Sequence, residues 1–227
     1  MKTYSVPIIT IDGPSGAGKG TIAQMLALDL NWNILDSGAL YRTLAFFLHN
    51  ENISLAQFSE IKEKIQKDFK VQFDPGSLAE PVRVIFKNED ITNKVRNEEI
   101  AKQTSILAAD PIVRDFIRPC QREFAELPGL IADGRDMGTV IFPEAELKIF
   151  LTASLEERAK RRQQQLKRQG MKVNMRVLLE ELEDRDRKDR EREHSPLVVA
   201  DDSVELDTTD IKPEGVVKKI KALPFFK

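Results

Sequence analysis

The chain holds one glycine-rich stretch whose residues could bind phosphate. Gly13, Gly18 and Lys19 stand at the spacing of the phosphate-loop pattern G-x-x-x-x-G-K-[ST]. The β-branched run at 8–12 predicts a buried strand before them, and the apolar run at 22–30 predicts a helix after them. Glycines let consecutive backbone N–H groups converge on one point, where the helix N-terminus and the lysine add positive charge. We therefore predict a phosphate-binding loop and not a flexible surface turn.

The position after the lysine departs from this pattern. It normally carries a hydroxyl that binds Mg²⁺, but here it is Gly20, and the hydroxyl comes one residue later at Thr21. Thr21 or a water molecule is therefore the Mg²⁺ ligand that we expect from this loop.

Asp36 and Ser37 lie where a second strand is expected to end. They follow the apolar residues 32–35 and precede a run at 39–48 that is typical of a helix. In parallel α/β sheets, ligands bind at the carboxyl ends of the strands. For Ser37 alone, a helix N-cap is the alternative interpretation. The helix would add an aromatic ring and a guanidinium to the same crevice, those of Tyr41 and Arg42.

Another loop at the same edge is expected after the buried strand 130–132. It reads D-G-R-D-M-G and brings Asp133, Arg135 and Asp136 close to the other two loops. The three loops together predict one site with both carboxylates and cations.

Charge is densest between residues 154 and 194. Residues 183–193 alternate in sign, and most of these charges are expected on a solvated helix face with i,i+4 pairs. Gly170 divides the region into two helices, which predicts a helical hairpin able to close over the site as a lid. Three of the charges share one helix face because they stand at i, i+4 and i+7: Arg185, Asp189 and Arg192. A basic run precedes them in the first helix: Arg158, Lys160, Arg161, Arg162, Lys167 and Arg168.

Composition limits the class of protein. The 227 residues suffice for one α/β domain with an insert or lid. A net charge of −2 argues against a general nucleic-acid surface. The single cysteine and two histidines show no metal-ligand spacing, which suits a reducing cytoplasm. Without a hydrophobic leader or a membrane-spanning run, we expect a cytoplasmic protein without a membrane partner, and a monomer, since no seam suggests a dimer.

The order of elements predicts an α/β fold of the P-loop NTPase type, in which helices flank a five-stranded parallel sheet. The five strands are expected at 8–12, 32–35, 130–132, 147–151 and 204–207. Between 98 and 125 we expect helix with a break near Asp110-Pro111. A period-two pattern predicts a small antiparallel sheet with strands at 71–73 and 82–86 and a third near Ile91-Thr92. Residues 1–227 then form one domain, with the core at about 1–60, 98–153 and 195–227, the insert at about 61–97 and the lid at about 154–194.

Over nearly its whole length the chain resembles the bacterial cytidylate kinases among the nucleoside monophosphate kinases. The phosphate loop 13–21 fits many kinases, and Gly20 is usual in this family. The stretches 35–42, with D-S-G-A-x-Y-R, and 131–140, with A-D-G-R-D-M-G-T, are far more specific, as is the arginine-rich lid that ends near Arg192. The resemblance implies transfer of the γ-phosphoryl group of ATP to CMP or dCMP with Mg²⁺, in pyrimidine nucleotide metabolism.

The resemblance also implies roles for individual residues. ATP would bind the phosphate loop, made of Gly13, Pro14, Ser15, Gly16, Ala17, Gly18, Lys19, Gly20 and Thr21. The acceptor's phosphate would contact Ser37, Arg42 and Arg135. Its cytosine base would contact Ser105, Arg114 and Asp136. Its sugar would contact Arg185 and Asp189, and Arg192 would lie near the phosphates. Arg158 and Arg162 would come over the donor phosphates. Asp36, Tyr41 and Asp133 complete the expected CMP site, and the expected catalytic set is Lys19, Arg135, Arg158, Arg162 and Arg192.

Three alternatives make different demands on the sequence. A GTP-binding switch needs N-K-x-D, but residues 93–96 read N-K-V-R, and D-x-x-G is also absent. An RNA-binding protein would use the basic residues 158–168 and would release RNA steeply as salt rises. A kinase for another small acceptor is the alternative among enzymes.

Overall fold

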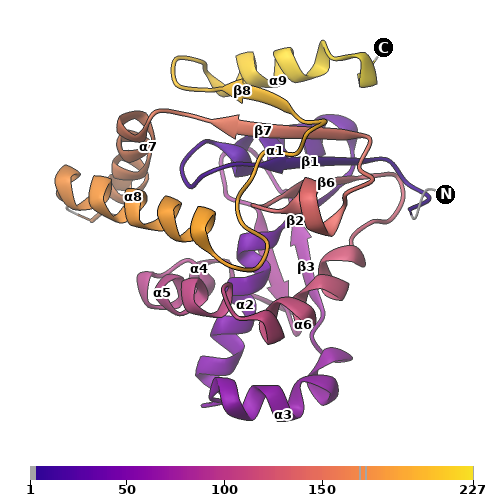
Figure 1. The fold of residues 1–227 in the computed structure, drawn as a ribbon, viewed down its shortest axis with the longest axis vertical. Coiled ribbons are helices and arrows are strands. Elements are labelled where there is room, and N and C mark those ends of the chain that lie inside the picture. The colour runs from indigo at the N-terminus through magenta and orange to yellow at the C-terminus, as the bar shows by residue number, and fades with distance from the viewer. Residues whose placement is uncertain (1–3, 169, 172, 227) are drawn as a thin grey trace.

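The computed structural model describes residues 4–168, 170–171 and 173–226. Residues 1–3, 169, 172 and 227, which belong to the expected domain and lid, lie outside the described residues. Five parallel strands form the main sheet in the order β2-β6-β1-β7-β8, which confirms the prediction (Figure 1). The strands are β1 Ile8–Asp12, β2 Asn33–Asp36, β6 Leu130–Asp133, β7 Leu147–Thr152 and β8 Val204–Asp207.

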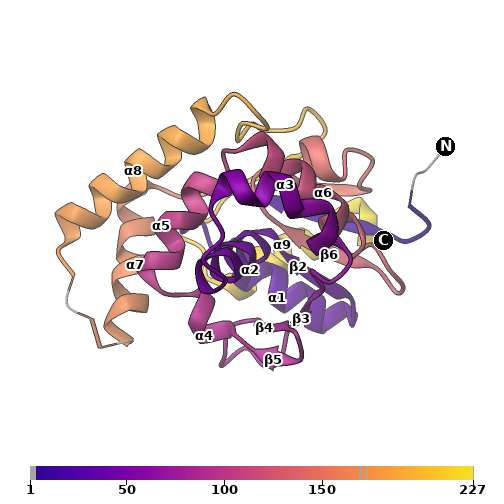
Figure 2. The ribbon, with the colours of Figure 1, turned by 90° about the horizontal axis from the view of Figure 1, so that it is seen from below.

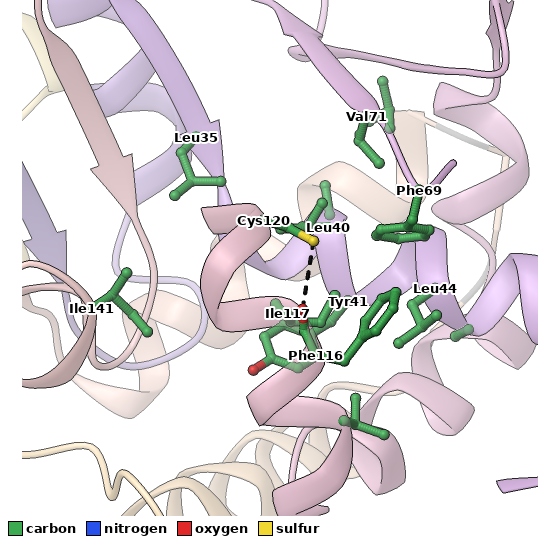
Figure 3. Packing of buried hydrophobic residues seen from close by; sticks show 14 of the residues in the cluster. Leu35, Leu40, Tyr41, Leu44, Phe69, Val71, Phe116, Ile117, Cys120 and Ile141 are labelled. Atoms are coloured by element: carbon green, nitrogen blue, oxygen red, sulfur yellow. Dashed lines mark hydrogen bonds between the residues drawn. The ribbon is translucent and has the colours of Figure 1, made fainter. Parts of the chain in front are cut away.

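The two faces of this sheet have separate hydrophobic cores. Every residue of β1 is buried, with Ile8 in one core and Ile9 and Ile11 in the other. On the first face lie helices α2 (Ser37–Asn50), α3 (Leu55–Gln66) and α6 (Pro111–Arg122), and on the second α1 (Lys19–Leu30) and α9 (Pro213–Lys221). Figure 3 shows Tyr41 of α2 among Leu40, Phe116 and Ile117, so apolar packing holds α2 against α6.

The small antiparallel sheet has the order β3-β4-β5, with β3 at Val71–Asp74 and β4 at Arg83–Phe86. The expectation of a third strand near Ile91-Thr92 was wrong, because β5 is Glu89–Asp90. Lys87 and Asn88 both have positive φ (51° and 63°), so they form a two-residue hairpin turn that pairs Phe86 with Glu89. Thr92 already belongs to a short helix, α4 (Thr92–Val95), and its backbone N–H donates to Asp90 Oδ1.

The helical regions follow the sequence pattern. The break predicted near Asp110-Pro111 separates α5 (Glu98–Leu107) from α6, and Asp110 caps α6 by accepting hydrogen bonds from two backbone N–H groups. The predicted hairpin is α7 (Leu155–Arg168) followed by α8 (Met175–Glu191) (Figure 2). These two helices pack through a core of their own, made of Ala159, Leu166, Leu178 and Leu182.

The expected insert is attached to the core in two ways. Helix α3 runs across residue 61, where we expected the insert to begin. On the other side, the Gln24 amide of α1 donates to the carbonyls of Pro75, Ser77 and Glu80 in the β3–β4 connection. The remaining elements are the π-helix η1 (Met137–Ile141) after β6 and the 3₁₀ turn η2 (Pro224–Phe226) at the end of the described chain.

Candidate active site

The phosphate loop connects β1 to α1 in a conformation that requires its glycines. Gly13, Gly16 and Gly18 all have positive φ, between 80° and 143°. A Cβ atom on Gly13 would lie 2.1 Å from the Leu151 carbonyl oxygen, so only glycine fits there. Since Gly18 is the N-cap of α1 and has no side chain, the first N–H groups of the helix remain available to an anion.

Lys19 is enclosed by this loop. Its side chain is 6% exposed, and its Nζ donates to the Pro14 carbonyl at 3.0 Å and lies 4.0 Å from Asp133 Oδ1. Burial lowers the pKa of Lys19, and the charge on Arg135 lowers it further. Burial likewise raises the pKa of Asp133. The charged form of Lys19 is therefore stabilised by any anion that binds in the loop.

Asp12 fixes the loop after β6, a role that we did not predict from the sequence. Its carboxylate accepts hydrogen bonds from the backbone N–H groups of Met137 (2.9 Å) and Gly138 (2.8 Å). Burial raises the pKa of Asp12 to about 6, although these two hydrogen bonds oppose the shift. Because Arg135 and Asp136 immediately precede these residues, Asp12 sets their positions relative to the phosphate loop.

The start of α2 forms one wall of the site. Asp36 is the N-cap of α2 and accepts a hydrogen bond from Ala39 N (2.8 Å), whereas Ser37 is the first helical residue and its hydroxyl is bound by Gln121. Arg96, also missed in the sequence, lies 3.8 Å from Asp36. Arg42 is half-buried and donates to the Val95 carbonyl.

A buried polar cluster stands beside this wall. Arg114 and Asp136 are ion-paired, each about 4% exposed, and Arg192 at the end of α8 approaches the second Asp136 oxygen at 3.9 Å. The guanidinium of Arg114 lies 5.9 Å from the centre of the Tyr41 ring. Three buried donors in this cluster have no hydrogen-bond partner within the described chain: the Tyr41 hydroxyl, Arg114 Nε and Arg192 Nη2. Burying donors without partners costs free energy unless a ligand supplies the missing hydrogen-bond acceptors.

The helical hairpin of α7 and α8 reaches the site through α8. Asp189 accepts from Arg135 Nε at 2.8 Å, and Arg135 also donates to its neighbour's carbonyl, that of Gly134. Burial would raise the pKa of Asp189, but the charge of Arg135 beside it brings the pKa below its ordinary value. Arg185 stands one turn earlier on α8. The i, i+4, i+7 spacing therefore turns Asp189 toward Arg135 and Arg192 toward Asp136, whereas the Arg185 side chain is exposed.

Arg158 is buried (5% exposed) between α7 and the phosphate loop. Its Nη1 donates to the Ser15 carbonyl (3.0 Å), its Nε to the Ala153 carbonyl (3.1 Å) and its Nη2 to Asp186 Oδ2 (2.6 Å). Asp186 is equally buried, although it lies in the run that we expected to be solvated. All three guanidinium nitrogens thus bind protein oxygens.

Two neighbouring arginines of α7 differ in their surroundings. Arg161, which the sequence analysis named in the basic run without a role of its own, donates to Thr208, and its Nη1 lies 3.7 Å from the position that a Cβ on Gly18 would take. Arg162 is half-buried, and its Nη1 donates to Gln165 in the next turn. Of these two arginines, Arg161 is the one whose contacts place it beside the phosphate loop.

Two predicted residues stand apart from these contacts. Ser105 is exposed on α5, and its side chain has no hydrogen bond to any residue that the structure describes. Thr21 is exposed in the first turn of α1.

The surroundings of Gly20 suit a metal ion that arrives with a nucleotide. A Cβ on Gly20 would lie 3.4 Å from Asp133 Oδ2, so glycine leaves space beside this carboxylate. Among the described residues, no group of three His, Cys, Asp or Glu side chains could hold a metal ion by itself. Mg²⁺ commonly keeps several waters and binds one or two carboxylates together with substrate phosphates, so the site fits that ion.

The parallel sheet, the glycine loop around Lys19 and the arginine-lined carboxyl edge define a P-loop kinase. The family model described as cytidylate kinase matches residues 9–224. Curated cytidylate kinases are similar over almost the whole chain: that of Pseudomonas putida is 48% identical (95% of this chain and 94% of that one), that of Stutzerimonas stutzeri 49% (95% and 93%) and that of Pseudomonas aeruginosa 50% (95% and 94%). The chain belongs to the cytidylate kinase family. In the part of the chain that is described, no helix combines the length and apolar character needed to cross a membrane.

Proposed function

We propose that this protein transfers the γ-phosphoryl group of ATP to CMP or dCMP, which gives ADP and CDP or dCDP. The observation that carries the proposal is the crowding of cations at the carboxyl edge of the sheet. The Arg185 side chain is exposed, yet the surrounding protein and then the charge on Arg135 lower its pKa, against the opposing effect of the Asp189 carboxylate. Arg42 and Arg162 lower this pKa further. Guanidinium groups that repel one another in this way are stabilised when phosphate oxygens come between them.

The buried polar cluster around Arg114 and Asp136 favours cytosine as the base that this site recognises in the acceptor. The N4 amino group of cytosine is a donor beside the N3 acceptor, whereas uracil carries an acceptor and a donor in the reverse order. Asp136 can accept from N4, and Arg114 can donate to N3 or O2. With uracil, the Asp136 carboxylate would face O4, which is also an acceptor. A site whose buried groups require particular partners rejects analogues strongly.

For phosphoryl transfer, the protein mainly has to position the two reactants and supply positive charge. The acceptor is a phosphate dianion and is already nucleophilic, so no general base is needed. The donor phosphates would occupy the loop around Lys19, and the acceptor phosphate would lie between Ser37, Arg42 and Arg135. In-line transfer then depends on alignment and on cations around the moving group. Lid arginines that close over the site would add charge and exclude water.

Several parts of this proposal concern the setting of the reaction. Mg²⁺, held through Asp133 and nucleotide phosphates with Thr21 or water nearby, would supply charge neutralisation at the transferred group. We infer that residues 154–194 act as the lid and 61–97 as the acceptor-binding insert of one domain. We also infer a monomer that works in the cytoplasm on nucleotides and on no nucleic-acid polymer.

Incubation with ATP, Mg²⁺ and a panel of nucleoside monophosphates, followed by separation of the products, tests the proposal. We expect CDP and dCDP as the main products, with far less UDP. The Lys19→Met variant should keep its fold but lose turnover, because the lysine neutralises phosphate charge. Equal use of all monophosphates, or full activity of a folded Lys19→Met variant, would contradict the assignment.

A further inference from the structure

One buried contact in the acceptor site has no part in the chemistry described so far. Gln121 of α6 is fully buried (0% exposed), and its Nε2 donates to Ser37 Oγ at 2.8 Å across 84 residues of sequence. Ser37 is itself 5% exposed at the start of α2. The two side chains therefore meet inside the protein, and Ser37 is the one that we expect to contact the acceptor's phosphate.

We infer that Gln121 is a positioning residue that makes the Ser37 hydroxyl a hydrogen-bond donor toward the acceptor's phosphate. This inference rests on the proposed function, in which Ser37 contacts that phosphate. A hydroxyl has one hydrogen to donate and two lone pairs that can accept. Because Gln121 already donates to the Ser37 oxygen, the hydroxyl hydrogen is directed away from Gln121. A phosphate dianion can only accept, so a preset donor is the polarity that it requires.

The orientation of the Gln121 amide follows from the groups around it. Its Oε1 is buried and has no hydrogen-bond partner in the described part of the chain. If the amide were reversed, Oε1 would accept the Ser37 hydrogen and the NH₂ group would become the unpaired one. A buried carbonyl without a partner is tolerated better than a buried N–H group without one. The observed orientation is therefore the less costly, and it leaves the Ser37 hydrogen available to a ligand.

A double-mutant cycle on Gln121→Leu and Ser37→Ala isolates this role. The leucine keeps the volume but removes the donor, so the hydroxyl is no longer fixed in the donating orientation. We expect Gln121→Leu to weaken CMP binding about tenfold, which corresponds to one hydrogen bond to a charged group. In the Ser37→Ala background the same change should have almost no effect. Cytidine, which lacks the phosphate, should compete with CMP equally well before and after the Gln121 substitution.

Gln66→Leu is the matched control. Gln66 is another glutamine whose amide contacts α6, donating to the Phe116 carbonyl (3.3 Å) and to Cys120 Sγ (3.0 Å), but it does not touch Ser37. The Gln66→Leu substitution should leave the dissociation constant of CMP unchanged. If Gln121→Leu fails to fold, Gln121→Met enters the same cycle, since methionine also lacks the amide.

The results separate this inference from the proposed function. A Gln121 substitution that weakens CMP binding equally with and without the Ser37 hydroxyl, or that weakens cytidine as much as CMP, would show a general packing role and overturn the inference. The same conclusion follows if Ser37→Ala has no effect on CMP. The proposed function fails separately, if the unmodified protein does not phosphorylate CMP.

Discussion

Removal of the Asp186 carboxylate should weaken the attachment of the α7–α8 hairpin to the phosphate loop. Arg158 and Asp186 are ion-paired at 2.6 Å, and their side chains are 6% and 7% exposed. In Asp186→Ala the guanidinium stays buried without its anion, a change that typically costs about 3–5 kcal/mol. Two features place the loss near the low end. Arg158 keeps its bonds to the Ser15 and Ala153 carbonyls, and Asp186 Oδ1 has no hydrogen-bond partner among the described residues.

Asp184→Ala is the control, because Asp184 lies on the same helix but is 41% exposed and pairs with Arg187 and Lys188 on the surface. Exposed pairs of this kind contribute about 0–1 kcal/mol. Unfolding in guanidinium chloride, with the m-value unchanged between variants, gives the loss of folding free energy in each variant. The KM for ATP shows whether the phosphate loop is also affected. Replacing both Arg158 and Asp186 by leucine should recover part of the loss, since no unpaired charge remains. Equal effects of Asp184→Ala and Asp186→Ala would refute the reasoning.

Three further predictions concern acceptor choice, closure and protonation. Asp136→Ala should narrow the CMP:UMP ratio of kcat/KM, whereas Arg42→Ala should slow both acceptors alike; an equal loss for both in Asp136→Ala would show that the carboxylate orients Arg135 and does not read the base. Protease sites in 154–194 should be cut readily in the free protein and protected by a bisubstrate analogue, and equal cleavage would indicate a static hairpin. Burial holds the Lys19 pKa below the ordinary 10.5, and bound phosphates should raise it again. At pH values between these two pKa values, ATP binding should therefore take up a proton, and the affinity for ATP should fall as the pH rises. Calorimetry in buffers of different ionisation enthalpy measures this proton uptake, which Lys19→Met should abolish.

The sheet and the phosphate loop could be predicted because local patterns determine them. The β-branched run at 8–12 and the glycines after it specify a buried strand and a loop with positive φ without reference to distant residues. The third strand of the small sheet was misplaced because the position of its turn depends on only two residues. Lys87 and Asn88 adopt the left-handed conformation, and the pattern did not distinguish them from the polar residues that follow.

The site was predicted less completely, because its supporting contacts join residues far apart in sequence. The Arg158 bond to the Ser15 carbonyl spans 143 residues, and no local pattern indicates it. Asp186 is different, since its burial had a sequence signal that we did not use. It stands four residues after Leu182 and eight after Leu178, on the apolar face of α8. A charged residue in register with buried leucines is a candidate for a buried ion pair.

The central claim is that two nucleotides are held in line within a cation-rich site and exchange a phosphoryl group directly. ATP made chiral at its γ-phosphorus with oxygen isotopes tests this claim most directly, after transfer to CMP and analysis of the β-phosphorus of the CDP. A single in-line step predicts inversion of configuration at phosphorus. Retention would contradict the account, because it would require a second displacement through a covalent intermediate on the protein.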